Sequence, residues 1–88
     1  MISRRITIVN ALGLHARAAA RFVKVASGFK SHIEVACGHR TMDGKSILGL
    51  LLLAAARGTA IEISADGIDE HDAVAALCGL AERGFEDS

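Results

Sequence analysis

The apolar run at residues 47–56 is the feature that most restricts how this chain can fold. Its ten residues are all apolar or glycine, and they fit a helix that is apolar on every side. Such a helix is normally buried all round, but a chain of 88 residues forms only one small core and can hardly surround it. We therefore expect part of the helix to stay exposed, and a contiguous exposed apolar patch usually marks a contact surface. We expect some of Ile47, Leu48, Leu51 and Leu52 to be exposed.

Strand and helix patterns alternate along the rest of the chain. Short β-branched or alternating apolar segments predict strands over residues 6–9, 32–37, 40–43 and 61–64. Helical spacing predicts a helix over residues 16–26 with the buried stripe Ala19, Phe22, Val23 and Ala26. A third helix is expected to start near Asp69 or Glu70 and to be stopped by Gly84, with the stripe Ala73, Ala76, Leu77 and Leu80.

The resulting order β-α-β-β-α-β-α favours one layer of helices on one face of a sheet. If the strand at 61–64 lies between the strands at 6–9 and 32–37, every neighbouring pair is antiparallel. We therefore expect an α+β open-faced sandwich, with a four-stranded antiparallel sheet and three helices on one face. No linker or internal repeat divides the chain, so we expect a single domain over residues 1–88.

His15 stands directly before the helix expected at 16–26. Gly13 permits a backbone reversal that frees the imidazole, and the first helical amides, at Ala16 and Arg17, form an anion site. The Arg17 guanidinium suits phosphate oxygens. A nucleophilic nitrogen beside a phosphate cradle of Ala16 and Arg17 can carry a phosphoryl group, so His15 and Arg17 are the predicted catalytic residues. The positive end of the helix should favour neutral imidazole, the nucleophilic form.

Charge is distributed unevenly, although the formal net charge is zero. Residues 1–45 hold eight Lys or Arg and two Asp or Glu, whereas residues 46–88 hold two and eight. The half that contains His15 is therefore cationic. This favours an acidic protein or a phosphate group as partner and not nucleic acid, which usually requires a net basic domain.

Arg17, Arg21 and Lys24 follow one another at helical spacing, beginning beside His15. This basic ridge is either an ordinary solvated helix face or a docking surface for an acidic partner, and both interpretations stay open. Combined with the apolar helix, it yields a set of expected docking residues. They are Ala20, Arg21, Lys24, Ile47, Leu48 and Leu51.

Ser46 directly precedes the apolar helix and is placed to cap its first turn. A phosphate group at this position would meet the positive end of the helix. Ser46 is therefore either a cap alone or a cap that also serves as a regulatory phosphorylation site.

Several features bear on location. The N-terminus lacks the apolar core of a secretory signal, and residues 47–56 fall well short of the roughly 18 residues of a membrane span. Cys37 and Cys78 lack a zinc-binding spacing and are interpreted as free thiols. We expect a cytoplasmic protein with no membrane partner, no metal and no cofactor.

Three motifs in combination resemble the histidine-containing phosphocarrier proteins (HPr) of the bacterial phosphotransferase system. They are Gly13-Leu14-His15-Ala16-Arg17, the Gly44-Lys45-Ser46 turn before an apolar helix, and Gly58-Thr59 before the last strand. The resemblance covers essentially the whole chain. Ala18 stands where many members have proline, which pre-sets the backbone early in a helix. Residues 82–87 and the leucine-rich helix look more like the nitrogen-related branch than the sugar branch, and the branch stays open.

The resemblance implies that Nδ1 of His15 accepts phosphate from the phosphoenolpyruvate-dependent first enzyme and passes it to a downstream acceptor domain. It also implies that Arg17 attends the phosphoryl group and that Ser46 matches a serine modified by a dedicated kinase in some lineages. The chain has no Gly-rich nucleotide loop and no carboxylate set for magnesium, so donor and acceptor must be proteins that dock over His15. We expect a monomeric carrier that is not a free-standing enzyme. The alternative is a non-catalytic regulatory module that binds partners according to its phosphorylation state.

Overall fold

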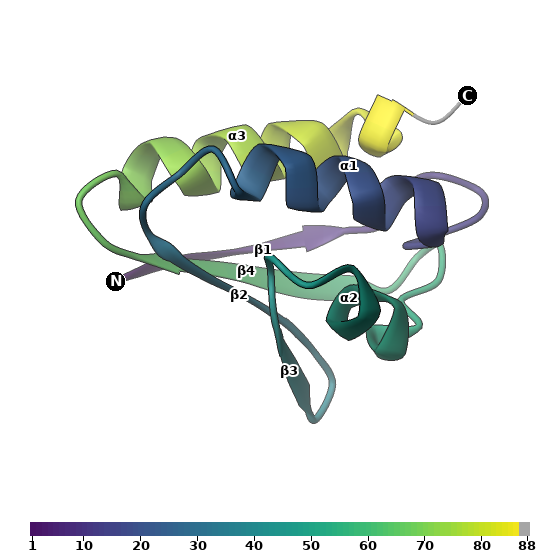
Figure 1. Ribbon diagram of the computed structural model, residues 1–88. Coiled ribbons are helices and arrows are strands. Elements are labelled where there is room, and N and C mark those ends of the chain that lie inside the picture. The colour runs from purple at the N-terminus through teal and green to yellow at the C-terminus, as the bar shows by residue number, and fades with distance from the viewer. Residues whose placement is uncertain (87–88) are drawn as a thin grey trace.

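The computed structural model describes residues 1–86 (Figure 1). Its elements follow in the predicted order and end in a 3₁₀ turn that the sequence pattern did not indicate. They are β1 (Ile2–Thr7), α1 (Ala16–Ala26), β2 (His32–Cys37), β3 (Arg40–Asp43), α2 (Ile47–Leu53), β4 (Ala60–Asp66), α3 (Glu70–Glu82) and the 3₁₀ turn η1 (Gly84–Glu86). Within this part of the chain, no helix has the length and apolar character needed to cross a membrane.

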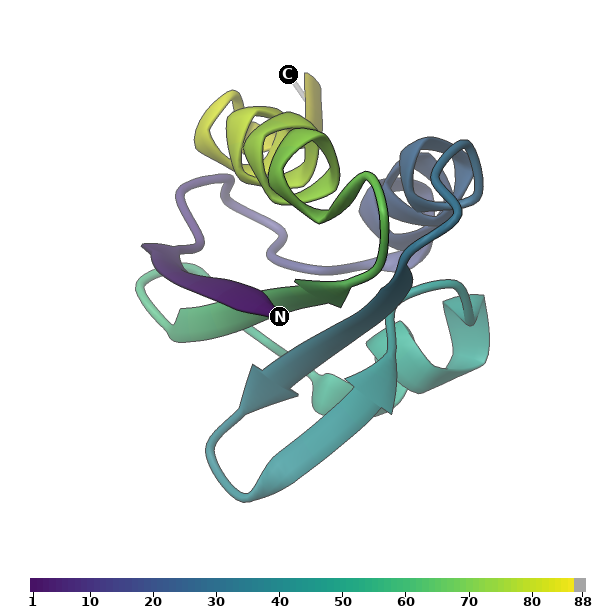
Figure 2. The same cartoon turned by 90° about the vertical axis from the view of Figure 1, so that its left-hand side faces the viewer.

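The sheet has the strand order β1-β4-β2-β3, and all neighbouring strands are antiparallel. β4 therefore lies between β1 and β2, as predicted. Figure 2 shows α1 and α3 side by side over one face of the sheet. The α3 helix packs on β1 and β4, whereas α2 packs on β3 and against α1. The predicted open-faced sandwich is confirmed.

β1 begins at Ile2, four residues before the predicted start, and ends at Thr7, two residues before the predicted end at Val9. Residues 3–5 are polar and exposed, so this segment lacks the apolar pattern that predicts a strand. Pairing with β4 along the whole of β1 supplies its backbone hydrogen bonds. Ile6 and Ile8 are buried, which agrees with their predicted inward face.

The core fills the space between the sheet and the helices. On α1, Ala19, Phe22 and Ala26 are buried as predicted, while Val23 is half-buried and Ala18 is fully buried. Ala18 thus widens the buried stripe of this helix beyond the four positions expected from its spacing.

α3 also buries a wider face than predicted. Ala73, Leu77 and Leu80 are buried as expected, and Ala76 is half-buried. The additional buried residues are Val74, Cys78 and Ala81. They are covered because α3 contacts β1, β4, α1 and η1. Burial raises the pKa of the Cys78 thiol, which keeps it in the protonated, unreactive form.

α2 ends at Leu53, three residues before the predicted end at residue 56. Ala54 takes a left-handed conformation (φ 51°) that stops the helix, and the Ala55 carbonyl then accepts a hydrogen bond from the Leu14 amide. The expected apolar exposure is confirmed. The exposed fractions are 43% for Ile47, 67% for Leu48, 36% for Leu51 and 48% for Leu52, and we refer to these four residues as the α2 patch.

One carboxylate ties the connection between α1 and β2 to the start of α3. The Asp69 side chain accepts hydrogen bonds from the amides of Lys30 (2.8 Å) and Ser31 (2.9 Å) and from the Ser31 hydroxyl (2.5 Å). Ser31 is buried. The bond from the Ser31 hydroxyl, followed by the bond from the Lys30 amide, holds the pKa of Asp69 below its ordinary value.

Replacing Asp69 by alanine should lower the melting temperature most at neutral pH. Because the folded-state pKa is lowered, the carboxylate contributes stability above its unfolded pKa, and this contribution is lost as the pH falls through the folded pKa. Thermal melting of the wild type and Asp69→Ala from neutral to strongly acidic pH measures this difference. The gap between their melting temperatures should narrow in acid. The exposed Asp72, also in the first turn of α3, provides the control Asp72→Ala. A difference in melting temperature between the wild type and Asp69→Ala that does not vary with pH would contradict the expectation.

Candidate functional site

The segment between β1 and α1 folds back on itself before it reaches His15. The Gly13 amide donates to the Asn10 carbonyl (3.1 Å), and the Asn10 side-chain amide donates to the Gly13 carbonyl (2.7 Å). Gly13 has a φ of 66°, and a Cβ at this position would lie 2.4 Å from the Ala55 carbonyl oxygen. Glycine is therefore required here, and the predicted backbone reversal is confirmed.

His15 is the N-cap residue of α1. Its backbone is extended (φ −81°, ψ −178°), and its Nδ1 accepts a hydrogen bond from the Arg17 amide at 3.3 Å. A nitrogen that accepts a hydrogen bond carries a lone pair, so this geometry assigns the proton of the neutral ring to Nε2. The half-buried imidazole therefore presents its unprotonated nitrogen at the start of the helix.

This contact refines the predicted phosphate cradle. The sequence predicts that the amides of Ala16 and Arg17 are open to an anion, whereas the Arg17 amide is directed at Nδ1 of His15. Histidine is not among the usual N-cap residues, which is why the pattern did not indicate the contact. A group bonded to Nδ1 would displace this hydrogen bond, and the Arg17 amide could then donate to the oxygens of that group.

Arg17 adds a positive charge to the same short segment. Its side chain is exposed on the first turn of α1, and a guanidinium is a planar donor suited to two oxygens at once. A nucleophilic nitrogen, a backbone N–H and a guanidinium thus come from His15 and Arg17 alone. This combination can bind and hold a small anionic group.

The helix that carries the α2 patch is joined to the segment that presents His15. The Leu14 amide donates to the Ala55 carbonyl (2.9 Å), which joins the residue before His15 to the segment that follows α2. The α2 helix contacts α1 and lies beneath its N-terminal half (Figure 1). On α1 the predicted docking residues Ala20 and Lys24 are exposed. A partner that covers His15 can therefore contact both helices.

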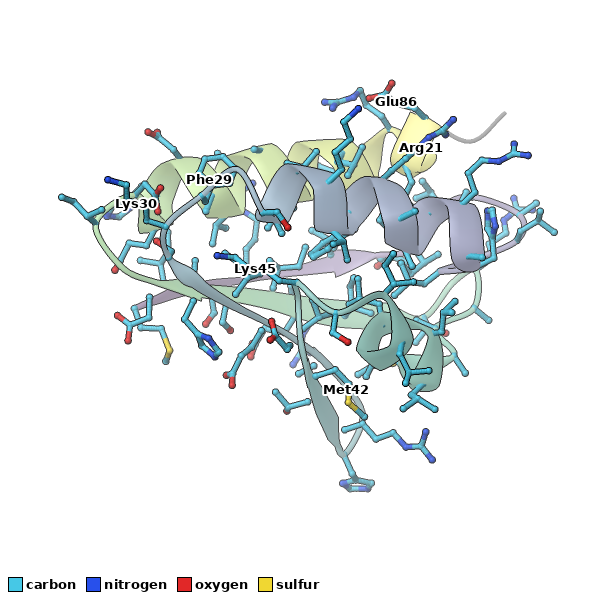
Figure 3. The ribbon with its side chains drawn as sticks, viewed as in Figure 1. Arg21, Phe29, Lys30, Met42, Lys45 and Glu86 are labelled. Carbon is cyan, nitrogen blue, oxygen red and sulfur yellow. The ribbon has the colours of Figure 1, made fainter. Side chains whose placement is uncertain are left out.

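Arg21 makes contacts that its helical spacing does not predict. Its Nη1 donates to the carbonyl oxygens of Phe85 (2.8 Å) and Glu86 (2.6 Å), and Figure 3 shows its side chain directed toward Glu86. The η1 turn is left-handed, with φ of 65° at Gly84, 57° at Phe85 and 58° at Glu86, and Phe85 is fully buried. Arg21 thus fixes this turn against α1. That Arg21 also contacts a docked partner protein remains a prediction.

Ser46 caps α2, as predicted. Its Oγ accepts a hydrogen bond from the Gly49 amide at 3.0 Å. The preceding residue, Lys45, donates from Nζ to the Phe29 carbonyl at 2.8 Å (Figure 3). These two hydrogen bonds hold the start of α2 in place. The Ser46 side chain is half-buried. A regulatory role for Ser46 stays a prediction.

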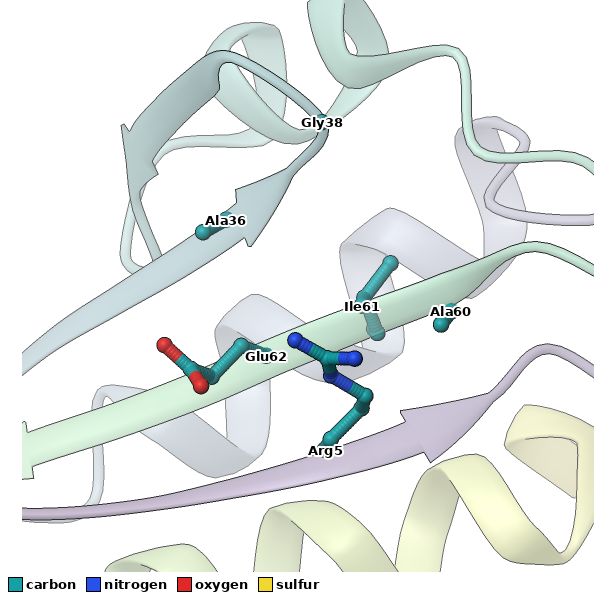
Figure 4. A pocket seen from close by; sticks show the side chains of 6 residues that line it. All are labelled: Arg5, Ala36, Gly38, Ala60, Ile61 and Glu62. Carbon is teal, nitrogen blue, oxygen red and sulfur yellow. The ribbon is translucent and has the colours of Figure 1, made fainter.

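Other candidate features lie away from His15. A hollow of about 330 Å³ occurs on the face of the sheet opposite the helices, and Arg5 and Glu62, which face each other across β1 and β4, contribute to it (Figure 4). Its other lining residues are Ala36, Gly38, Ala60 and Ile61. The histidines at 32, 39 and 71 are exposed and stand outside the loop between β1 and α1. The features that suit phosphoryl chemistry therefore meet at His15.

Known proteins are similar to this chain in sequence and in fold. A family model described as the PTS HPr component phosphorylation site matches residues 2–83. The phosphocarrier protein HPr of Neisseria meningitidis serogroup A is 50% identical over 80 residues, which cover 91% of this chain and 90% of the relative. The crystal structure of HPr-C-His from Thermoanaerobacter tengcongensis has a TM-score of 0.95 at 41% identity, with 100% of this chain and 99% of that chain covered.

A crystal structure of an HPr dimer from the same organism has a TM-score of 0.79 at 41% identity, with 99% of this chain and 100% of that chain covered. Dimers therefore occur among similar proteins, and the monomeric state of this chain stays a prediction.

Proposed function

The chain belongs to the HPr family, the phosphocarrier proteins of the phosphotransferase system, and we propose that Nδ1 of His15 is the atom that carries the phosphoryl group. The observation that best supports this assignment is the hydrogen bond from the Arg17 amide to Nδ1. It leaves Nδ1 unprotonated and places it at the positive end of α1, where a helix favours negative charge.

The transfer uses groups that are already in place. The Nδ1 lone pair forms a bond to phosphorus while the bond between phosphorus and the donor atom breaks, and the donor keeps that electron pair. The Arg17 amide leaves Nδ1 and donates to a phosphoryl oxygen, and the Arg17 guanidinium binds further oxygens. The second transfer reverses these steps with the acceptor in the position of the donor.

We infer that donor and acceptor are both proteins, the phosphoenolpyruvate-dependent first enzyme and a downstream acceptor domain. Both must reach the same atom, so their binding must be transient. The apolar docking residues Ile47, Leu48 and Leu51 are partly exposed, and the basic residues of α1 favour an acidic partner surface. The complete proposed surface is Ala20, Arg21, Lys24, Ile47, Leu48 and Leu51.

The assignment is tested by incubating the protein with phosphoenolpyruvate and a purified first enzyme and mapping the modified residue. We expect one phosphoryl group, on His15, in an adduct that is labile in acid and stable in alkali. The variants His32→Ala, His39→Ala and His71→Ala should accept phosphate at the wild-type rate, because these residues lie outside the site. Phosphate mapped to any of these three histidines would overturn the assignment.

A phosphate group on Ser46 should suppress transfer through His15 without unfolding the protein. The dianion would lie at the positive end of α2 and at the edge of the α2 patch, where it stabilises the helix but opposes the docking of an acidic partner. Ser46→Asp, with about half of the charge, should weaken binding of the first enzyme and leave the melting temperature unchanged or higher.

The variant Ser46→Ala separates these two effects. It removes the bond to the Gly49 amide and should cost about 0.5–2 kcal/mol of stability, while binding of the first enzyme stays at the wild-type level. Equal affinity of the wild type, Ser46→Ala and Ser46→Asp for the first enzyme would leave Ser46 as a helix cap alone.

A further inference from the structure

We propose that Asn10 is a positioning residue for phosphoryl transfer, whose side-chain amide sets the direction in which the backbone leads into His15. This inference rests on the proposed function of His15. Asn10 acts through the backbone of the loop, and three observations support its role.

The first is the fixation of the peptide unit between Gly13 and Leu14 at both ends. Its carbonyl oxygen accepts a hydrogen bond from Nδ2 of Asn10 at 2.7 Å, and its N–H donates to the Ala55 carbonyl at 2.9 Å. A peptide unit is planar, so two bonds from opposite sides determine how the plane is turned. The chain reaches His15 only one residue later.

The second is the residue at which the plane could turn. Gly13 has no Cβ and permits a wide range of ψ, so no side chain of its own restricts the orientation of its carbonyl. Without the Asn10 amide, the bond from Leu14 to Ala55 would be the remaining hydrogen bond that the described residues make to this peptide unit. Asn10 and Leu14 are 7% and 4% exposed, so water has little access to replace the lost donor.

The third is the support of Asn10 itself by η1. A Cβ on Gly84 would lie 3.3 Å from Cβ of Asn10, so the C-terminal turn packs directly against this side chain. Arg21 holds the same turn through the carbonyls of Phe85 and Glu86. Arg21 belongs to α1, the helix that His15 caps. Asn10 is therefore held between the loop that presents His15 and a turn fixed to the helix of His15.

This role predicts a separation of kinetic effects. The docking residues are on α1 and α2, so loss of the Asn10 amide should leave partner binding nearly intact. A displaced nucleophile slows the chemical step, and a displacement of about 1 Å can cost a factor of about 100. With this protein as the substrate of the first enzyme, kcat should fall while KM changes little.

The test compares Asn10→Ala and Asn10→Asp with the wild type. Alanine removes the donor, and aspartate keeps the size of the side chain but presents a carboxylate that cannot donate to the Gly13 carbonyl. In both variants kcat should fall about tenfold or more, with KM within about threefold of the wild type. The NMR signal of the Arg17 amide should shift and exchange faster, because its bond to Nδ1 of His15 is disturbed.

Ser31→Ala is the matched control, because it removes a buried side-chain hydrogen bond near the opposite end of α1. It should lower the melting temperature and leave both kcat and the Arg17 signal unchanged at a temperature where all variants are folded. Wild-type kcat in both Asn10 variants, or an equal loss in Ser31→Ala, would overturn the inference; if Asn10→Ala does not fold, the kcat of Asn10→Asp decides. If the wild-type protein takes no phosphate on His15, the proposed function itself is wrong. If the wild type is phosphorylated on His15 and the Asn10 variants keep its kcat, only the role of Asn10 is wrong.

Discussion

His15→Asn should abolish phosphoryl acceptance while the protein keeps its fold. Asparagine is among the best N-cap residues, so its side-chain oxygen can accept the hydrogen bond from the Arg17 amide that Nδ1 of His15 accepts in the wild type. It offers no nucleophilic ring nitrogen, so the phosphoryl group has no atom to bond to. Mass spectrometry after incubation with phosphoenolpyruvate and the first enzyme should detect no modified protein, and thermal melting should remain close to that of the wild type.

His15→Ala completes this comparison. It removes the cap as well as the nucleophile and should therefore melt at a lower temperature, by an amount equivalent to about 0.5–2 kcal/mol. Both variants should be equally inactive as acceptors. If His15→Asn is phosphorylated at any residue at the wild-type rate, the assignment of Nδ1 as the carrier atom is wrong.

Leu48→Glu should weaken binding of the first enzyme about tenfold or more without unfolding the protein. Leu48 is 67% exposed in the α2 patch, so the free protein tolerates a charge there. In the complex the side chain would be desolvated, and central contacts of an interface can contribute about 2 kcal/mol or more, equivalent to more than a factor of ten in affinity. Leu51→Glu should act in the same direction. Calorimetric titration with the first enzyme measures the loss.

Ile68→Glu is the control for this experiment. Ile68 is an apolar residue that is 91% exposed in the connection between β4 and α3, outside the proposed docking surface. The Ile68→Glu variant introduces the same charge and should leave the affinity for the first enzyme unchanged. Equal losses in Ile68→Glu and Leu48→Glu would indicate a general effect of negative charge, and unfolding of Leu48→Glu would show that the α2 patch belongs to the core.

Local patterns predicted those parts of the fold in which burial follows the periodicity of the chain. The bounds of α1 were predicted correctly because apolar and charged positions separate cleanly around this helix. The first four residues of β1 were missed because residues 3–5 are polar, and their strand conformation depends on pairing with β4. The end of α2 was misplaced because Ala54 and Ala55 suit a helix, whereas the contact from Leu14 to Ala55 requires the chain to turn.

The candidate site was predictable only where a local motif determines it. Gly13 and His15 at a helix start were sufficient to indicate His15 as the candidate nucleophile. The contact between Nδ1 of His15 and the Arg17 amide was not predicted, because histidine rarely caps helices. The contacts of Arg21 depend on the left-handed backbone conformation of residues 85 and 86. Phenylalanine and glutamate rarely adopt this conformation, so the residue types there did not indicate it. The branch prediction from residues 82–87 includes Asp87, which lies outside the described residues.

The position of β4 between β1 and β2 has a consequence for the protein during its synthesis. The ribosome produces residues 2–7 long before residues 60–66, with which they pair, and it produces Arg21 long before the carbonyls of residues 85 and 86. Contacts between such distant parts of a chain form late and slowly. His15 is thus synthesised well before the segments that complete its surroundings, which are β4 and the turn at residues 84–86. A nascent chain interrupted before residue 60 would contain the histidine but none of the pairing that holds β1, and it would not serve as a carrier.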